Sequence, residues 1–268
     1  MMRLRASAVR VRAVCLRHLY VMRSSPVRVL EMIYWPTMQM VLWGFFSNFF
    51  RTQSSLLAQA ASIFIGAMLL WDSLFRSNLG VSVSFLEEMW SRNLGHLFVS
   101  PLRPAEYLMA LVLMSLLRTL TGILPACLLA IPFYEYNIFQ MGFPLIAFFV
   151  NVLVTGWALG FVISALILRF GMGAESLAWV VVFAFAPFSA IYYPVSSLPE
   201  WLQVFALCLP QTHVFEGMRS VLFDGIFDYG HFQAACALNL VFLLVAGAGF
   251  LYSFRVARQK GLLLGTGE

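Results

Sequence analysis

Long apolar runs separated by short polar stretches cover most of this 268-residue chain. A helix needs about 20 mostly apolar residues to cross the hydrocarbon core of a bilayer. Runs of that length predict six spanning helices, at about residues 29–50, 56–80, 105–131, 143–168, 176–194 and 232–254. We therefore expect an all-α membrane protein, with a single transmembrane domain over residues 1–268 and both chain ends on the same side.

The first 28 residues carry an apolar stripe between arginines. One helical face collects Leu4, Ala8, Val11, Cys15, Leu19 and Met22, at the three- and four-residue spacing of an amphipathic helix. Seven arginines and no acidic residue accompany this stripe. We expect residues 1–28 to lie in the membrane surface, with the stripe in lipid and the guanidinium groups at lipid phosphates. A mitochondrial transit peptide is the alternative with the same composition.

A compact polar stretch, residues 84–104, follows the second predicted span, and we call it the elbow. One face of a short helix would carry Leu86, Trp90, Leu94 and Leu97. The polar positions of that helix are Glu87, Glu88, Ser91, Arg92 and His96. Ser84 and Glu87 have capping-box spacing, and Pro101 and Pro104 end the helix. A stiff amphipathic elbow of this kind is suited to contact with a soluble partner.

Four prolines divide residues 186–225 into short segments. Ser197 and Glu200 have capping-box spacing, and the helix that follows must end at Pro210, which makes it too short to span a bilayer. A second short helix over 212–223 would stop at Gly225. We expect a re-entrant helical hairpin over residues 195–225, packed against protein or a watery pathway. A long surface loop is the alternative.

Composition and charge support the membrane assignment and orient the chain. The sequence is 61% hydrophobic and 11% charged, whereas soluble domains carry roughly 25% charged residues. Thirteen lysines and arginines flank the predicted spans on the side of the chain ends, and only Arg51 and Arg219 lie on the other side. The positive-inside rule then places both termini in the cytoplasm. We expect a protein of the bacterial plasma (inner) membrane.

Few ionisable residues fall inside the predicted spans. Asp72 and Arg76 are four residues apart on one helix and can neutralise each other. Arg118 lies roughly 20 Å along the third span, where it could pair with a carboxylate or carbonyl of the bundle or with an anionic lipid head group. A chain of acidic residues and histidines along several spans, typical of a proton-coupled carrier, is missing.

The sequence lacks the common catalytic and cofactor motifs. A P-loop requires a lysine followed by Ser or Thr, and Lys260, the one lysine, is followed by Gly261. The four histidines have no metal-ligand spacing, so we predict no metal site. We also expect no nucleic-acid partner. Energy for any transport would then come from a partner chain or an ion gradient.

Two motifs resemble the type-two ATP-binding-cassette (ABC) exporter permeases. The elbow is similar to their cytoplasmic connector, a Ser-Pro-Leu-x-Pro-x-Glu-Tyr motif after an acidic helix, at Ser100, Pro101, Leu102, Pro104, Glu106 and Tyr107. The hairpin resembles their outer region at Tyr193, Pro194, Leu198, Pro199, Trp201, Leu202, Pro210, Thr212, Glu216 and Arg219. With the six-span layout, the resemblance covers essentially the whole chain.

The resemblance implies a permease that pairs with a second copy or paralogue and docks two ATPase subunits, which bind the ATP and Mg. ATPase coupling would fall to Leu86, Glu87, Glu88, Trp90, Arg92, Leu94, Leu97, Ser100 and Pro101. Gating would fall to the hairpin residues Pro194, Pro199, Trp201, Pro210, Glu216 and Arg219. Speculative substrate contacts are Arg118, Tyr192 and Tyr193.

The function implied is export of an amphiphilic or glycan-type substrate, and two alternatives stay open. One is a gradient-driven carrier. The other is an intramembrane lipid-modifying enzyme, since His213, Glu216 and Arg219 fall together on one short helix.

Overall fold

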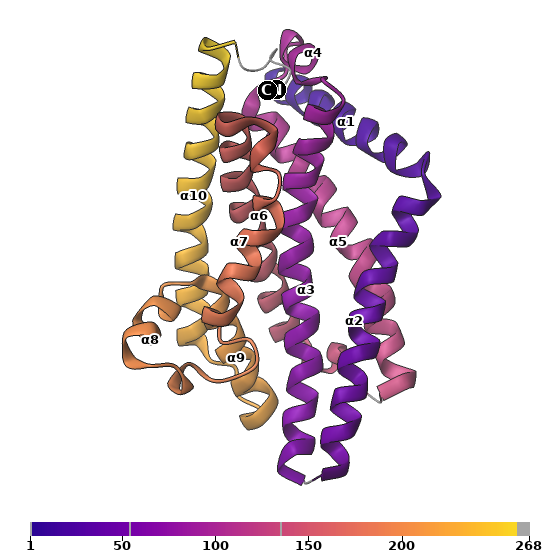
Figure 1. The fold of residues 1–268 in the computed structure, drawn as a ribbon, viewed down its shortest axis with the longest axis vertical. Coiled ribbons are helices and arrows are strands. Elements are labelled where there is room, and N and C mark those ends of the chain that lie inside the picture. The colour runs from indigo at the N-terminus through magenta and orange to yellow at the C-terminus, as the bar shows by residue number, and fades with distance from the viewer. Residues whose placement is uncertain (1, 54, 135, 262–268) are drawn as a thin grey trace.

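The computed structural model describes residues 2–53, 55–134 and 136–261, and these form helices joined by short loops, with no strand among them (Figure 1). The α-helices are α1 (Met2–Arg23), α2 (Pro26–Gln53), α3 (Ser55–Trp90), α4 (Leu94–Val99), α5 (Pro104–Tyr134), α6 (Phe143–Phe170), α7 (Leu177–Phe185), α8 (Glu200–Leu207), α9 (Pro210–Asp224) and α10 (Tyr229–Gln259). Single 3₁₀ turns are η1 (Ile138–Met141), η2 (Gly171–Ala174), η3 (Ala186–Phe188) and η4 (Val195–Ser197). The all-α prediction is confirmed.

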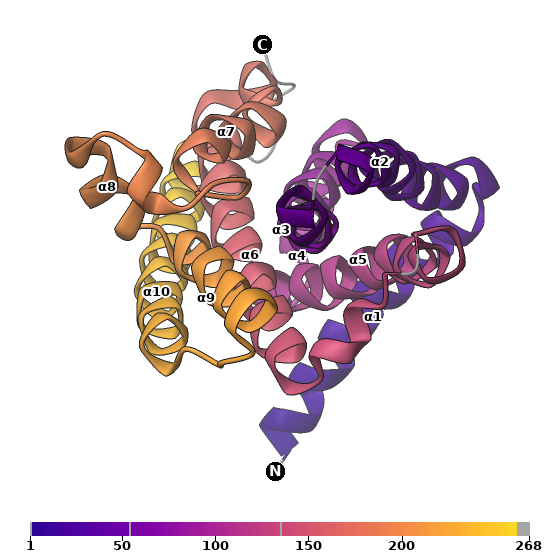
Figure 2. The same ribbon diagram turned by 90° about the horizontal axis from the view of Figure 1, so that it is seen from below.

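The long helix α3 lies at the centre of the bundle and packs against α2, α5 and α6, while α10 packs on α6 (Figure 2). Helix α1 crosses one end of the bundle beside α5, and α4 and the last turn of α10 lie at that same end (Figure 1). We call this the elbow end. Helices α8 and α9 lie toward the opposite end, which we call the hairpin end (Figure 1).

Three helices in the described part of the chain are both long and apolar enough to cross a membrane: α5, α6 and α10. They contain the spans predicted at 105–131, 143–168 and 232–254. The spans predicted at 29–50 and 56–80 lie within the continuous helices α2 and α3, which carry more polar residues.

The fifth predicted span, 176–194, is not one continuous helix. Helix α7 ends at Phe185 and is followed only by the turn η3, so the apolar helical segment Leu177–Phe188 is about 18 Å long. Pro187 has no N–H to continue the α-helix, and the chain bends again at Ala190, whose φ is +50°. A dozen helical residues fall short of a bilayer core of about 30 Å.

The face of α1 differs from the prediction. Val11 and Cys15, expected in lipid, pack against the core formed by α3, α5, α6 and α10, and Val14 is buried beside them. On the opposite side of α1, Val9, Leu16 and Tyr20 are exposed. Helix α1 therefore has two apolar faces. The predicted stripe was assigned to the wrong environment at Val11 and Cys15, because periodicity does not show whether lipid or protein covers a face.

Close contact between α3 and α6 depends on a glycine. A Cβ atom at Gly156 would overlap the Ser77 hydroxyl and lie 2.5 Å from the carbonyl oxygen of Leu74, a main-chain atom of α3. Gly160, one turn later, would place a Cβ 2.7 Å from the Cβ of Val81. Small residues let the backbones of membrane helices approach one another, and α6 uses two of them against the central helix.

We predict that Gly156→Ala destabilises the protein by about 1–3 kcal/mol, because the added methyl group must push α6 away from the backbone of α3. The measurement is the thermal unfolding midpoint in detergent. Gly249→Ala on α10 is the matched control, since a Cβ there meets nothing within 4 Å. Equal midpoints for the two variants would show that this contact is not close.

Candidate functional site

The elbow is built from the end of α3, a tight turn and α4. Helix α3 ends in a Schellman motif, in which the N–H of Arg92 donates to the Met89 carbonyl and the N–H of Asn93 to the Glu88 carbonyl, both at 2.9 Å. Arg92 takes the left-handed conformation that this motif requires, with φ of +52°. The single short helix predicted from Leu86 to Leu97 is wrong, because Leu86 and Trp90 belong to α3 and Leu94 and Leu97 to α4.

Both predicted capping boxes are also wrong. Ser84 lies inside α3, and its hydroxyl donates to the Gly80 carbonyl of the preceding turn. At the hairpin end, Ser197 lies in η4, and Pro199 occupies the position before α8, where no side chain caps the helix. In each case the helix begins at a different residue from the one that the motif suggested.

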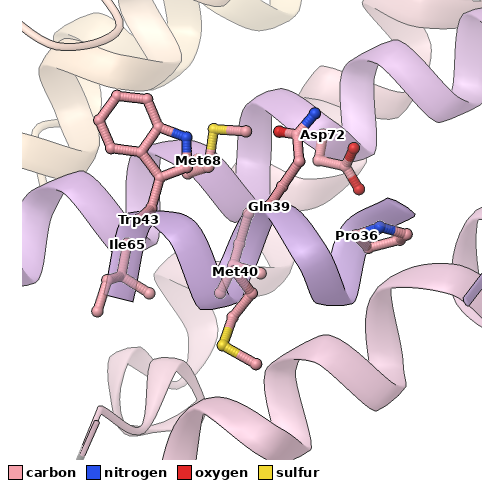
Figure 3. A pocket seen from close by; sticks show the side chains of 8 residues that line it. Pro36, Gln39, Met40, Trp43, Ile65, Met68 and Asp72 are labelled. Atoms are coloured by element: carbon pink, nitrogen blue, oxygen red, sulfur yellow. The ribbon is translucent and has the colours of Figure 1, made fainter. Parts of the chain in front are cut away.

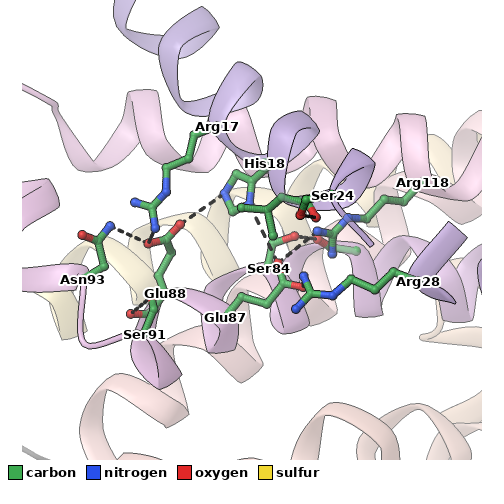
Figure 4. A network of polar contacts seen from close by, with 12 residues as sticks. Arg17, His18, Ser24, Arg28, Ser84, Glu87, Glu88, Ser91, Asn93 and Arg118 are labelled. Atoms are coloured by element: carbon green, nitrogen blue, oxygen red, sulfur yellow. Dashed lines mark hydrogen bonds and ion pairs between the residues drawn. The ribbon is translucent and has the colours of Figure 1, made fainter. Parts of the chain in front are cut away.

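Two carboxylates at the elbow, the half-buried Glu87 and the buried Glu88, tie four helices together, and we call them and their partners the anchor network (Figure 4). Glu87 of α3 accepts hydrogen bonds from Arg28 of α2 at 3.2 Å and from Arg118 of α5 at 3.0 Å. Glu88, the next residue, pairs with Arg17 of α1 at 3.0 Å and accepts a hydrogen bond from the Asn93 amide at 2.8 Å. The carboxylate partner left open for Arg118 is thus Glu87.

A third carboxylate, Glu106 in the first turn of α5, holds the start of α1. It accepts two hydrogen bonds from the Arg10 guanidinium, at 2.5 and 2.7 Å, and one from the Ser7 hydroxyl at 2.7 Å. It also accepts the main-chain N–H of Arg103 at 3.0 Å, which caps α5. Glu106 was predicted only as part of a motif, and its structural role is to join α1 to α5.

His18 of α1 lies at the centre of the anchor network and is 2% exposed. Its ring nitrogens are 3.9 Å from Glu87 and 3.7 Å from Glu88, beyond hydrogen-bond distance. Burial lowers the pKa of His18 to about 4; Arg118 and Arg17 act in the same direction, while Glu87 opposes them. Burial also raises the pKa of Glu88, against the hydrogen bond from Asn93 and the charge of Arg17. At neutral pH His18 is therefore uncharged.

The structure divides the predicted coupling residues into an inner and an outer set. The inner set is buried or paired within the chain: Leu86, Glu87, Glu88 and Leu94, with Leu97 half-buried. The outer set is accessible: Trp90, Arg92, Ser100 and Pro101. Val99, which we did not predict, is the most exposed apolar residue of the elbow at 87%. The sequence signal that could have identified Val99 is an apolar residue directly before the polar turn at Ser100 and Pro101.

The predicted gating residues Glu216 and Arg219 clamp the main chain of the hairpin end. Glu216 of α9 accepts the N–H of Val195 at 2.6 Å and pairs with Arg219 at 2.8 Å. Arg219 donates in turn to the Ile191 carbonyl at 3.4 Å. His213 is turned to other partners, the ring of His231 and the Leu207 carbonyl, both at 2.9 Å. Glu216 and Arg219 thus contact the main chain and each other, while His213 faces a different set of groups.

The predicted helices of the hairpin are present as α8 and α9, although the proposed substrate contacts do not come together. Tyr192 stacks on Trp43 of α2 with ring centroids 5.0 Å apart. Tyr193 donates its hydroxyl hydrogen to the Pro187 carbonyl, and Trp201 on α8 is 73% exposed. Arg118 belongs to the anchor network at the elbow end instead. The roles of these four residues in transport stay predictions.

Comparison with known proteins identifies the family. Residues 21–223 match the sequence profile of the ABC-2 type transporter family. The chain belongs to this family. The ABC-2 match covers the anchor network from Arg28 onward, the elbow and α9 up to Phe223. The chain is therefore the membrane-embedded part of an ABC transporter, as the two sequence motifs indicated.

A curated relative agrees with this assignment over part of the chain. The ABC-2 type chain is 32% identical over 147 residues to ABC transporter G family member 20 of Dictyostelium discoideum. The match covers 54% of this chain and 20% of that relative, so the chain spans about a fifth of the length of the relative it matches.

The environment of His18 predicts an acid-sensitive anchor network. Because folding lowers the His18 pKa from its ordinary 6.5 to about 4, the unfolded chain binds the proton first as the pH falls. The free energy of unfolding should therefore fall between pH 6.5 and 4, by up to about 3 kcal/mol from this group. We expect His18→Gln to flatten that part of the profile, measured as the thermal midpoint in detergent against pH.

The control is His96→Gln, since His96 lies on the exposed side of the elbow. This variant should keep the natural pH profile. A His18→Gln variant as acid-sensitive as the natural chain over this pH range would contradict the assignment of a neutral, buried His18.

Proposed function

We propose that this chain is the permease subunit of an ATP-driven ABC exporter. Two copies, or one copy and a paralogue, would form a path across the membrane, and two separate ATPase subunits would bind the ATP and Mg. The observation that carries the proposal is the geometry of the elbow, in which an exposed tip is braced by ion pairs to three other helices.

The outer surface of the elbow suits a soluble partner. Trp90 and Val99 are 47% and 87% exposed, next to the polar groups of Arg92, His96 and Ser100. An open groove of about 420 Å³ runs between α1 and α4 beside this surface. Exposed aromatic and apolar side chains with a polar rim are typical of protein interfaces, and the groove could accept a segment of the partner.

The anchor network gives the elbow a way to transmit force. A push on α4 reaches the end of α3 directly, and Glu87 passes it to α2 and α5 through Arg28 and Arg118. Glu88 and Glu106 pass it to α1 through Arg17 and Arg10. We infer that closure of the ATPase subunits rotates these helices as one body, because separation would leave the largely buried carboxylates of Glu87, Glu88 and Glu106 without their charged partners.

The topology that fits this proposal has both termini and the elbow in the cytoplasm of a bacterium and the hairpin on the outer side of its plasma membrane. Helices α2, α3, α5, α6 and α10 would make five crossings, and residues 176–194, which begin with α7 and continue as turns, would make the sixth. The chain would then re-enter from the outer side through α8 and α9. The packing of α9 against α6 and α10, with Phe215 fully buried, supports a hairpin inserted into the bundle.

A substrate that is an amphiphile or a glycan fits the apolar, aromatic surroundings of such a path. The exposed face of α2 carries Tyr34, Met38, Leu42, Phe45 and Phe46. The hairpin, positioned by the Glu216 and Arg219 clamp, would control release on the outer side.

We predict that Val99→Asp lowers the ATPase activity that copurifies with the tagged chain by at least about tenfold, because the new carboxylate must be desolvated at the centre of the interface. The assay is vanadate-sensitive ATP hydrolysis by complexes purified from membranes. Val204→Asp on α8 is the matched control: it makes the same change at a 68% exposed valine of the hairpin, and should leave copurification unchanged. Full activity in the Val99→Asp preparation would refute elbow docking.

A further inference from the structure

Helix α2 contains a proline ten residues after its start, and this proline leaves one main-chain carbonyl without its helical partner. In an α-helix the N–H of each residue donates to the carbonyl four residues earlier. Pro36 has no N–H, so the carbonyl of Met32 loses the hydrogen bond that any other residue at position 36 would supply. An unpaired carbonyl within a membrane is costly, because lipid offers no donor.

Arg76 of the neighbouring helix α3 supplies the missing donor. Its guanidinium Nη1 lies 3.0 Å from the Met32 carbonyl oxygen. The charge is neutralised on α3 itself, where Nε of Arg76 donates to the Asp72 carboxylate one turn earlier at 2.6 Å. The predicted Asp72–Arg76 pair is confirmed, and it has a further partner that sequence analysis missed. Both side chains are largely buried, at 5% and 13% exposure.

A third helix closes around this contact. A Cβ atom at Gly122 of α5 would lie 2.7 Å from the Met32 carbonyl oxygen and 3.2 Å from Nη1 of Arg76. Only glycine leaves room for the arginine and the carbonyl to meet there. We call the set Asp72, Arg76, Met32 and Gly122 the carbonyl clasp.

The clasp lies at a boundary in α2. Before Pro36, the helix is tied to α3 twice, by Arg28 to Glu87 and by Met32 to Arg76. After Pro36, a small pocket of about 10 Å³, room for one water-sized group, lies between α2 and α3 beside Gln39 and Asp72 (Figure 3). The first part of α2 is thus held to α3 by hydrogen bonds and carries no buried side chain, whereas the part after the proline is held by packing, with Met40 buried in a core cluster.

We propose that Arg76 is a positioning residue for α2: it holds the carbonyl that Pro36 leaves free, and so fixes the point at which α2 bends when the elbow moves. The inference rests on the proposed function for its role in transport, but the contact itself can be tested without a partner. In this arrangement the first turns of α2 follow α3 and the anchor network, and the remainder of α2 turns about residues 32–36.

The contact is tested by restoring the missing donor. Pro36→Ala returns an N–H to the Met32 carbonyl, which matters most when Arg76 can no longer donate. The background is Asp72→Asn/Arg76→Met, in which both charges are removed together. We expect Pro36→Ala to raise the thermal midpoint in this background by at least about 4 °C more than it does in the natural chain.

Pro132→Ala is the matched control, because Pro132 also lies inside a helix, near the end of α5, and is exposed to the surroundings. Its effect should be the same in both backgrounds. Equal gains from Pro36→Ala in the two backgrounds would overturn the clasp, whatever the ATPase partner does.

The positioning role is tested by following the movement of α2. A nitroxide label on Leu42→Cys, in a chain whose natural cysteines are replaced by serine, reports the distance between two permease copies in the ATPase complex. In the complex that retains Asp72 and Arg76, ATP with vanadate should change the distance between the two labels. We expect the Asp72→Asn/Arg76→Met complex to hydrolyse ATP while losing at least about half of this change.

Adding Pro36→Ala to that variant separates stability from positioning. The thermal midpoint should recover, because the carbonyl is paired again, but the distance change should not, because α2 no longer bends there. Full movement without Arg76 would overturn the positioning role. Absence of any ATPase complex would instead contradict the proposed function, and the unfolding experiment would still decide the clasp.

Discussion

The fold depends most on the pairing of two consecutive carboxylates at the end of α3. Glu88 is 2% exposed, and a buried carboxylate is strongly destabilising unless charged or hydrogen-bonding groups surround it. Neighbouring residues on a helix point about 100° apart, so Glu87 and Glu88 must find partners on different sides. The arginines that satisfy them come from α1, α2 and α5, and this requirement places α1 across the end of the bundle.

This constraint connects the elbow to the rest of the membrane domain. Because Glu87 and Glu88 face inward, the elbow presents a different set of side chains outward, with Val99 and Trp90 the main apolar ones. Between Leu86 and Pro101, inner residues that hold helices together alternate with outer residues that are proposed to contact a partner. In the proposed mechanism, a displacement of the outer residues would act on the neighbouring ion pairs, which join four helices.

Sequence patterns predicted the existence of the helices well and their environment less well. Apolar runs located α2, α3, α5, α6 and α10, because length and hydropathy are local properties. The face of α1 was wrong, since periodicity shows that Val11 and Cys15 share a face but not whether lipid or protein covers it. The end of α3 was wrong because Arg92, rather than a glycine, takes the left-handed position. Partners such as Arg17 and Glu88 are 71 residues apart, a separation at which spacing carries no information.

The prolines and the charged residues of this chain have a common physical explanation. Pro36 frees a carbonyl that Arg76 binds, and after Pro194 the N–H of Val195 is bound by Glu216. Arg219 binds the Ile191 carbonyl in the same irregular segment. Since a bilayer supplies no donors or acceptors, every departure from helical hydrogen bonding must be satisfied by the protein itself. Ionisable residues in a membrane domain are usually read as contacts for substrate. Here Arg76, Glu216 and Arg219 form hydrogen bonds to main-chain groups, and these bonds hold the bent segments of the domain in place.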